Sequence, residues 1–414
     1  MTQISAETQA GGKQRRTEKF RTRQAAIMRT AVDLINHKGV RGMTLVEVAA
    51  RLDIGPTGVI YYFASKEELA AACFLRTIEA LDALIEAAAS AATPAERLRG
   101  FVRGYVALVR DIALGVRDPL AVFNDVRGVN DPVVNGAYIG MFRNARGLLG
   151  PLPPAGADRQ VRNAITHLVL SQLFWLVVWL RRYDPEDYDR VADRLLDVLE
   201  NGLGCAGAAF SLCARTPPTA PNVDVSRETF LRAATEIINE QGCVGASVDK
   251  ISARLNVTKG SFYHHNEAKD DLVVACFRRT LDVMRRTQRL AIQEAGDGWG
   301  QISAATTSLV QCQVSGATPL LRTSALTSAP ETMQRELVSD FDRISLNFAS
   351  MISDGIADGS VRPVDAHVGA QMVTATINAA AELHLWAALP PQEAATAYAR
   401  AFLHGWRSVI PAQT

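Results

Sequence analysis

The sequence predicts an all-α protein made of two tandem copies of one module. Residues 34–42 (LINHKGVRG) return 203 residues later as 237–245 (IINEQGCVG), and residues 50–52 return at the same offset as 253–255. A repeat of this period indicates a duplicated domain rather than a solenoid. Apolar residues recur with helical spacing along the chain, and a length of 414 residues suits two hydrophobic cores.

The start of each copy predicts four helices. Residues 21–37 carry an apolar stripe of helical period that ends at a Lys-Gly pair, as helix C-termini prefer. The motifs TLVE and SKEE, beginning at Thr44 and Ser65, are capping boxes that start a helix. Between them, residues 53–63 hold a tight turn and a short helix. Residues 227–290 repeat this order of elements.

The remainder of each copy is also predicted to be helical. It ends in two long apolar helices, at 158–182 and 185–210 in the first copy and at 364–389 and 391–410 in the second. Prolines lie between the members of each pair, and because proline interrupts a helix we expect a break there. The stretch RTPPTAP at 215–221 has three prolines and no periodicity, so we expect a linker there between the copies.

The charge of the chain is balanced at +1, so any binding to nucleic acid depends on local clusters of charge. Such a cluster stands at the N-terminus, where two glutamates oppose six basic residues: Lys13, Arg15, Arg16, Lys19, Arg21 and Arg23. By itself this arm is equally consistent with a solubilising tail.

The N-terminus is polar and has no secretory pattern, and the longest apolar run, 165–180, is shorter than the roughly 18 residues of a membrane span. We expect a buried helix there and no membrane partner. The six cysteines have neither paired nor metal-ligand spacing, and Cys73 and Cys276 hold equivalent positions typical of small core residues. These patterns predict a cytoplasmic protein with no metal site and no cofactor.

A helix, a tight turn and a second short helix form a helix-turn-helix, whose second helix fits the major groove of DNA. At this place the sequence resembles the TetR family of transcriptional regulators. The resemblance rests on VTKGSFYHH at 257–265, and on IGPTGVIYYF at 54–63 followed by SKEEL. It covers roughly residues 20–80 and 225–285. For each copy it implies a three-helix DNA-binding domain followed by a helical domain for ligand binding and dimerisation.

The resemblance divides the chain into six parts. In order, these are a basic N-terminal arm (1–19), helix-turn-helix domain 1 (20–66), helical ligand-binding and dimerisation domain 1 (67–213), the linker (214–224), helix-turn-helix domain 2 (225–269) and helical ligand-binding and dimerisation domain 2 (270–414).

The resemblance also implies which residues meet DNA. Hydroxyls at helix starts cap the helix and meet phosphates, and a lysine opening the fourth helix faces the DNA backbone. The start of the recognition helix reads bases, while Tyr62 and His265 at its end contact phosphate or sugar. In the first copy these residues are Thr44, Gly55, Pro56, Thr57, Tyr61, Tyr62 and Lys66. In the second they are Ser247, Thr258, Lys259, Gly260, His264, His265 and Lys269. The basic arm is expected in the adjacent minor groove, and Val59 and Ile60 are expected in the core.

The two recognition regions differ. Gly-Pro-Thr at 55–57 stands where the second copy has Thr-Lys-Gly at 258–260, so two unlike half-sites are expected in the operator. The second copy also has Asn266 in place of Phe63, Ala268 in place of the capping Ser65, and Lys250 in place of Glu47. We expect it to hold its recognition helix less firmly.

An effector pocket is implied for the C-terminal part of each copy. The candidate wall residues in the first copy are Phe101, Tyr105, Phe123, Asn124, Phe142, His167 and Trp175. Core packing explains most of them equally well, and His167 and Asn124 are more readily explained as hydrogen-bonded core groups. The helices at 165–180 and 367–389 are expected to pair the two copies, because a tether raises effective concentration into the millimolar range. A homodimer of chains with four helix-turn-helix domains is the alternative.

The sequence therefore favours a ligand-responsive transcriptional repressor whose partners are operator DNA and a small, apolar effector. An enzyme is disfavoured, because the chain has no Gly-rich phosphate loop, no His/Glu metal motif and no nucleophile elbow. The remaining alternative is a ligand-binding or scaffolding protein whose second DNA-binding domain has decayed.

Overall fold

The computed structural model describes residues 3–123, 129, 131–150, 158–212, 225–245, 248–256 and 269–408. The chain divides into two compact units. Unit 1 comprises Met1–Ala83 and Asp111–Met141, and unit 2 comprises Leu84–Arg110 and Phe142–Thr414. Unit 2 therefore contains helices from both copies of the repeat.

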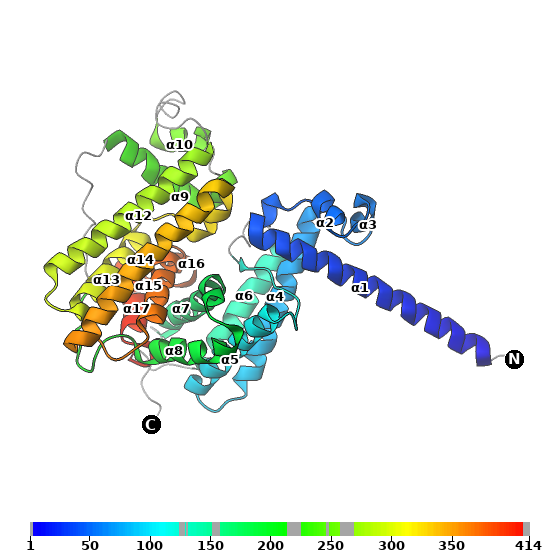
Figure 1. The fold of residues 1–414 in the computed structure, drawn as a ribbon, viewed down its shortest axis with the longest axis horizontal. Helices are drawn as coiled ribbons and strands as arrows, with labels where there is room; N and C mark the ends of the chain where they lie inside the picture. Colours follow the sequence, from blue (N-terminus) through cyan, green and yellow to red (C-terminus); the bar gives the residue numbers. More distant parts are fainter. Residues whose placement is uncertain are drawn as a thin grey trace. The chain divides into compact units, whose positions relative to one another are not determined.

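The fold is all-α, as the sequence predicts (Figure 1). The first copy contains α1 (Gln3–Gly42), α2 (Leu45–Arg51), α3 (Pro56–Ile60), α4 (Lys66–Ala89), α5 (Pro94–Ala113), α6 (Pro132–Gly147), α7 (Asp158–Trp179) and α8 (Tyr188–Asn201). The second contains α9 (Val225–Gly245), α10 (Val248–Leu255), α12 (Lys269–Glu294), α13 (Gly298–Ser315), α14 (Glu331–Asp358), α15 (Ala366–Ala380), α16 (Leu383–Trp386) and α17 (Pro391–Leu403). In the described residues, extended pairing is confined to one antiparallel bridge between Gly204 and Val361.

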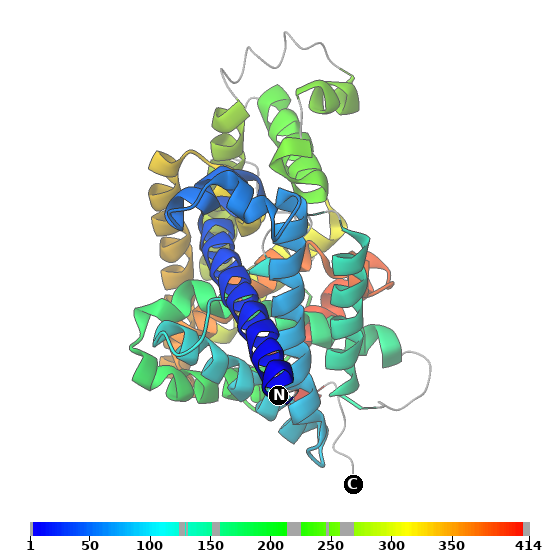
Figure 2. The ribbon, with the colours of Figure 1, turned by 90° about the vertical axis from the view of Figure 1, so that its right-hand side faces the viewer.

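Helix α1 begins at Gln3 and so continues through the predicted arm instead of beginning at residue 21, whereas its break and the two caps of unit 1 follow the predicted signals. The helical path of α1 is interrupted at Gly39, whose φ of 70° is the left-handed conformation that glycine tolerates. Thr44 caps α2 by accepting from the Glu47 N–H at 3.1 Å, and Ser65 accepts from the Glu68 N–H at 3.1 Å at the start of α4. From there α4 runs as one uninterrupted helix (Figure 2).

Three side chains tie α1 and α4 to the segment 119–122, and we call their hydrogen bonds the bracing contacts. The Asn36 amide donates to the Leu120 carbonyl and accepts from the Val122 N–H, both at 2.9 Å. Arg76 donates to the Pro119 carbonyl at 2.7 Å, and Thr77 accepts from the Ala121 N–H at 3.0 Å. Backbone groups without secondary-structure partners are satisfied in this way.

The second copy makes the same bracing contacts within unit 2. Asn239 donates to the Leu320 carbonyl at 2.9 Å and accepts from the Arg322 N–H at 3.1 Å. Arg279 donates to the Pro319 carbonyl at 2.7 Å, and Thr280 accepts from the Leu321 N–H at 2.8 Å. The repeat seen in the sequence is therefore a repeat of tertiary contacts.

In unit 2 the last helices of the two copies pack together, with α7 against α15 and α17 and α8 against α15. The buried Gln172 on α7 donates to the Met372 carbonyl at 3.1 Å and to Thr376 Oγ1 at 2.9 Å on α15. His167 Nε2 lies 2.8 Å from the Ala379 carbonyl. These polar groups are satisfied between the copies in an otherwise apolar interface.

The ends of α8 and α17 meet in an arrangement that repeats with the sequence. Gly202 and Gly405, which are 203 residues apart, have φ of 70° and 77°. A Cβ on Gly202 would lie 2.3 Å from the Leu403 carbonyl oxygen, and one on Gly405 would lie 2.2 Å from the Glu200 carbonyl oxygen. Gly202 and Gly405 therefore each lie against the backbone of the other copy. Such reciprocal contacts are typical of positions related by a two-fold axis.

Three predicted helices end earlier than expected, and one of them, predicted at 391–410, ends at Leu403. The helix predicted at 185–210 stops at Asn201, because Gly202 turns the chain into a non-helical segment that pairs with copy two, where the Leu203 N–H donates to the Leu403 carbonyl at 2.8 Å. The helix predicted at 364–389 breaks after Ala380. The apolar helix Arg159–Arg182 is long enough to cross a membrane, contrary to the sequence estimate, but 72% of its apolar window is buried, as in a core helix.

Candidate nucleic-acid interface

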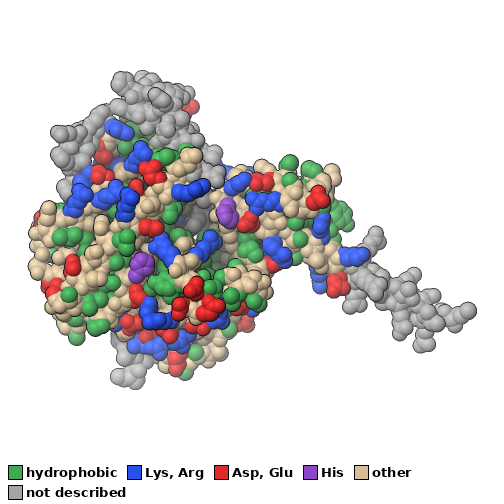
Figure 3. All heavy atoms as spheres, in the orientation of Figure 1, with side chains coloured by type: hydrophobic (Ala, Val, Ile, Leu, Met, Phe, Trp, Pro, Cys, Tyr) green, Lys and Arg blue, Asp and Glu red, His purple; other side chains and the backbone are tan. Residues whose placement is uncertain are grey.

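The DNA-contact residues predicted for the first copy lie on one exposed surface around α2 and α3. Thr44, Gly55, Pro56 and Thr57 are exposed, and Tyr61 is 74% exposed. Val59 is buried as predicted, whereas Ile60 is 49% exposed, so its assignment to the core was wrong. Ile60 faces solvent because α3 is only five residues long and buries a single side chain, Val59. Hydrophobic side chains are visible on the surface over this region in Figure 3.

Lys66 and Tyr62 are half-buried at the edge of this surface. The Lys66 ammonium donates to the Arg41 carbonyl at 3.3 Å, so its position is set by the end of α1. Other charges nearby are paired: Lys38 Nζ lies 2.7 Å from Glu47 Oε1, and Arg51 pairs with Asp33. The exposed cations at the base of the arm are Lys19 and Arg21.

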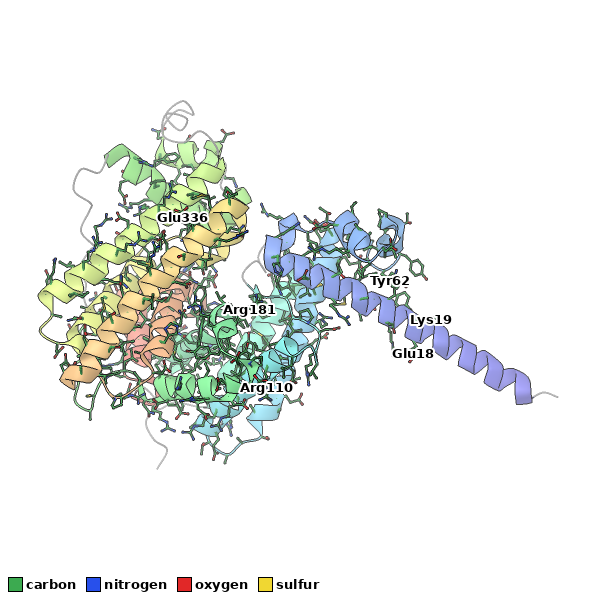
Figure 4. The ribbon with its side chains drawn as sticks, in the orientation of Figure 1. Glu18, Lys19, Tyr62, Arg110, Arg181 and Glu336 are labelled. Carbon is green, nitrogen blue, oxygen red and sulfur yellow. The ribbon has the colours of Figure 1, made fainter. Side chains whose placement is uncertain are left out.

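An aromatic cluster joins α1 to the end of the recognition helix. The Phe20 ring lies 4.7 Å from the Tyr62 ring and 6.1 Å from the Tyr61 ring, and the two tyrosine rings are 5.1 Å apart. In Figure 4, Tyr62 lies beside α1 near Lys19 and Glu18. The sequence interpretation missed Phe20, although an aromatic residue within a basic arm is a signal for such an anchor. The cluster fixes where the arm leaves the domain.

Most DNA-contact residues predicted for the second copy lie outside the described residues: Ser247, Thr258, Lys259, Gly260, His264 and His265. Lys269 is the first residue of α12, as predicted for the lysine that opens the long helix. On α10, Lys250 donates to Gln241 Oε1 at 2.6 Å, and Arg254 pairs with Glu240 at 3.1 Å.

The candidate effector residues that the structure describes are buried or half-buried. Phe101 and Tyr105 are buried on α5, and burial raises the pKa of the Tyr105 hydroxyl. Phe123 stacks on Phe74 with ring centroids 6.1 Å apart, in unit 1. Asn124 lies outside the described residues. His167 is hydrogen-bonded to α15, which fits its interpretation as a satisfied core group.

Two further candidates contact the second copy. Phe142 on α6 stacks on Trp386 of α16, with ring centroids 4.0 Å apart and planes 17° apart. Trp175 Nε1 donates to Gln371 Oε1 at 3.4 Å. A cavity of about 10 Å³, no larger than a water molecule needs, lies among α5, α6 and α7 and is lined by Leu98, Phe101, Ala145, Leu149, Thr166, Val169 and Leu170. An effector of drug-like size would have to open this core.

The described cysteines are free thiols. Cys73 and Cys276 are fully buried, as predicted, and burial raises the pKa of the Cys73 thiol to about 12. Within the described part of the chain, no group of three or more His, Cys, Asp or Glu side chains could hold a metal ion.

Comparison with known proteins identifies the two helix-turn-helix regions. The family model of bacterial regulatory proteins of the tetR family matches residues 27–73 and again residues 230–276. The Transposon Tn10 TetC protein of Escherichia coli is 29% identical over 83 residues, which are 20% of this chain and 42% of that protein's length.

The solved structures that resemble this chain each cover less than half of it. AibR in complex with isovaleryl coenzyme A and operator DNA is 17% identical, with 44% of this chain and 99% of that one covered at a TM-score of 0.35. PfmR from Thermus thermophilus, a TetR family transcriptional regulator, is 18% identical, with 42% and 97% covered at a TM-score of 0.34. With the family's N-terminal domain matched twice, the chain belongs to the TetR family of transcriptional regulators and is a tandem duplication of its module.

Proposed function

We propose that the protein is a ligand-responsive repressor in which one chain forms a pseudo-dimer and presents two unlike helix-turn-helix domains to an asymmetric operator. The observation that carries this proposal is the packing of α7 and α8 on α15 and α17 within one chain. Four helices, two from each partner, form a common bundle interface between protein subunits. The mutual approach of Gly202 and Gly405 adds the symmetry expected of such a pair.

Pairing within the chain leaves little of this face for a second chain. Leu168, Leu173 and Leu176 of α7 are fully buried, and so are Ala395 and Tyr398 of α17. A buried carboxylate adds to the interface: Glu200 of α8 accepts from Arg99 at 2.5 and 2.6 Å and pairs with Arg407 of the second copy at 3.0 Å. The alternative homodimer of chains would have to use another surface.

The DNA contacts follow from the exposed surface of helix-turn-helix domain 1. Thr44 and Lys66 bind phosphates, and Gly55, Pro56, Thr57 and Tyr61 meet base edges in the major groove. In domain 2, Ser247, His265 and Lys269 take the phosphate role, while Thr258, Lys259, Gly260 and His264 read a different sequence. Two different sets of side chains require two different half-sites.

The effector response requires two conformations of different ligand affinity. We place an apolar effector of the first copy among α5, α6 and α7, beside Phe101, Tyr105 and Phe142. The cavity there has a volume of only about 10 Å³ in this conformation. Opening it would move α6, whose residues from Pro132 to Met141 belong to the same compact unit as helix-turn-helix domain 1. The cytoplasm, where the operator is, is the compartment of this function.

A footprint of the purified full chain on the DNA flanking its own gene, with the mass of the complex measured in parallel, tests the proposal. One chain protecting two unlike half-sites is the expected result. Two chains on a symmetric site would overturn the pseudo-dimer. Absence of protection would favour the alternative of a ligand-binding protein with a decayed DNA-binding function.

A further inference from the structure

The recognition helix of the first copy exposes a largely apolar face. Residues one turn apart on α3 and its C-cap form this face, namely Pro56, Thr57, Ile60 and Tyr61. The Ile60 side chain is 49% exposed and Tyr61 is 74% exposed, whereas Val59 is fully buried. Single apolar residues on a surface are common, but several on one helix face are typical of an interaction site. We call these four residues the α3 face.

The α3 face lacks the side chains that form paired hydrogen bonds with bases. Residues 54–62 contain no Arg, Lys, Asn, Gln, Asp or Glu. In the major groove, arginine and lysine read guanine, asparagine and glutamine read adenine, and carboxylates accept from cytosine. The face instead presents the methyl groups of Ile60 and Thr57 beside two hydroxyls. Apolar side chains distinguish thymine, because its C5-methyl group is the apolar mark that a base shows in this groove.

The basic side chains around α2 and α3 are engaged elsewhere. Lys38 and Arg51 are held in ion pairs with carboxylates of the same domain. The Lys66 ammonium donates to the Arg41 carbonyl at 3.3 Å, where α1 ends and α4 begins. The proposed function assigns this junction to a phosphate, so base reading in the first copy is left to the α3 face.

The second copy differs from the first at the same positions. At the offset of the repeat, Lys259 corresponds to Pro56 and Tyr263 corresponds to Ile60. Lysine can donate to the O6 and N7 atoms of guanine, whereas proline and isoleucine cannot. The two copies therefore differ in the class of base contact that their recognition residues can make.

We propose that Ile60 is a specificity-determining residue, which packs against the C5-methyl group of a thymine in the first half-site. This inference rests on the proposed function, because it names what helix-turn-helix domain 1 reads. The exposed Ile60 side chain and the thymine methyl group both leave water on contact, and burial of one methyl group strengthens binding about fourfold. The first half-site is then selected through its A·T pairs, and a guanine there gains no paired hydrogen bond from α3.

Replacement of thymine by deoxyuridine tests this contact, because deoxyuridine lacks only the C5-methyl group. The purified full chain first selects bound duplexes from random DNA. Each thymine of a selected duplex is then replaced in turn, and affinity is measured by fluorescence titration. At one or two thymines of one half-site, deoxyuridine should weaken binding of the unmodified chain about fourfold. Ile60→Ala should bind the unsubstituted duplex about fourfold or more weakly, and the same replacements should cost it no further affinity.

Two further variants serve as controls. Ile139→Ala removes the same kind of side chain from α6 in unit 1, where it is 41% exposed, and should retain the full sensitivity to deoxyuridine. Ile60→Val keeps a branched apolar side chain and should retain part of that sensitivity, which keeps the test valid if Ile60→Ala does not fold.

The outcomes separate this inference from the proposed function. If the chain selects a duplex but Ile60→Ala and the unmodified chain respond equally to deoxyuridine at every thymine, Ile60 does not read a thymine methyl group, and the proposed function stands. If the chain selects no duplex, the proposed function fails and the role of Ile60 fails with it.

Discussion

Asn36 of the first copy and Asn239 of the second stand at equivalent positions and make the same two hydrogen bonds, to the backbone at 120–122 and at 320–322. On the surface the copies diverge. The Lys38–Glu47 ion pair of the first copy is replaced in the second by a hydrogen bond from Lys250 to Gln241. The duplication has kept the bracing contacts and has changed the face that surrounds the recognition helix.

This difference between core and surface follows from how much folding stability each kind of substitution costs. Loss of a half-buried amide that satisfies two backbone groups costs about 1–3 kcal/mol, whereas an exposed ion pair contributes at most about 1 kcal/mol. These exposed side chains were therefore free to diverge, whereas the bracing contacts were not. Two unlike faces on equivalent supports are what an asymmetric operator requires.

The largest loss of stability is expected from a substitution where the two copies are in contact. Gly202→Ala would place a Cβ 2.3 Å from the Leu403 carbonyl oxygen in a left-handed backbone conformation. Strain of about 1–2 kcal/mol and the backbone overlap together should lower the free energy of unfolding by about 3 kcal/mol or more. Urea unfolding measures this change, and operator affinity should fall with it.

The control for this change lies five residues away. Gly207 has a φ of 84°, but a Cβ added there would have no atom within 4 Å. Gly207→Ala should therefore cost only the strain, about 1 kcal/mol. Equal losses for the two variants would mean that the contact between α8 and α17 does not constrain the chain as described.

The bracing contacts give the next largest effect. Asn36→Ala and Asn239→Ala should each lower the free energy of unfolding by about 2 kcal/mol, because each leaves one carbonyl and one N–H without a partner. Asn201→Ala removes one exposed hydrogen bond, to Asp197, and should change stability by less than about 0.5 kcal/mol. A large loss for one bracing asparagine and none for its equivalent would contradict the repeat of contacts.

The sequence predicted these helices where the signal was local. Thr44, Ser65 and the break at Gly39 were recognisable because a cap or a helix stop depends on a few neighbouring residues. The stop of α8 at Gly202 was missed because it depends on the backbone of α17. Its signal was nevertheless present, since Gly405 stands 203 residues later, at the same offset as the rest of the repeat.

Some residues of the candidate site could be predicted from the sequence and others could not. The exposure of Gly55, Pro56 and Thr57 follows from the helix-turn-helix pattern, which specifies one buried and one exposed face. The effector residues could not be predicted in the same way, because a core aromatic such as Phe101 and a pocket wall have the same sequence pattern. Phe142 and Trp175 turned out to contact the other copy, which no local pattern encodes.

Substitution of Lys66 and of Lys269 compares the contributions of the two copies to DNA binding. Lys66→Ala should weaken binding about tenfold for every DNA sequence and lower the slope of log affinity against log salt by about 0.9, because one phosphate contact is lost. Lys269→Ala should do the same if domain 2 binds DNA. Electrophoretic or fluorescence titrations at several salt concentrations measure both quantities. If the salt slope of Lys66→Ala equals that of the unmodified chain, Lys66 is not part of the interface. The same result for Lys269→Ala would mean that domain 2 does not make the proposed phosphate contact.

The smallest expected effect concerns Phe20, for which the first copy has an aromatic cluster with Tyr61 and Tyr62. Phe20→Ala removes two ring contacts of about 0.5–1.5 kcal/mol each from a 38% exposed side chain, so the stability of the chain should change by about 1 kcal/mol. If the cluster directs the basic arm to DNA, operator affinity should fall by less than about tenfold, and the salt slope should fall with it. Leu114→Ala, at a residue 53% exposed in a loop of the same unit, is the matched control and should leave both unchanged. If Phe20→Ala lowers stability but keeps the salt slope, the cluster supports the fold of domain 1 without directing the arm to DNA.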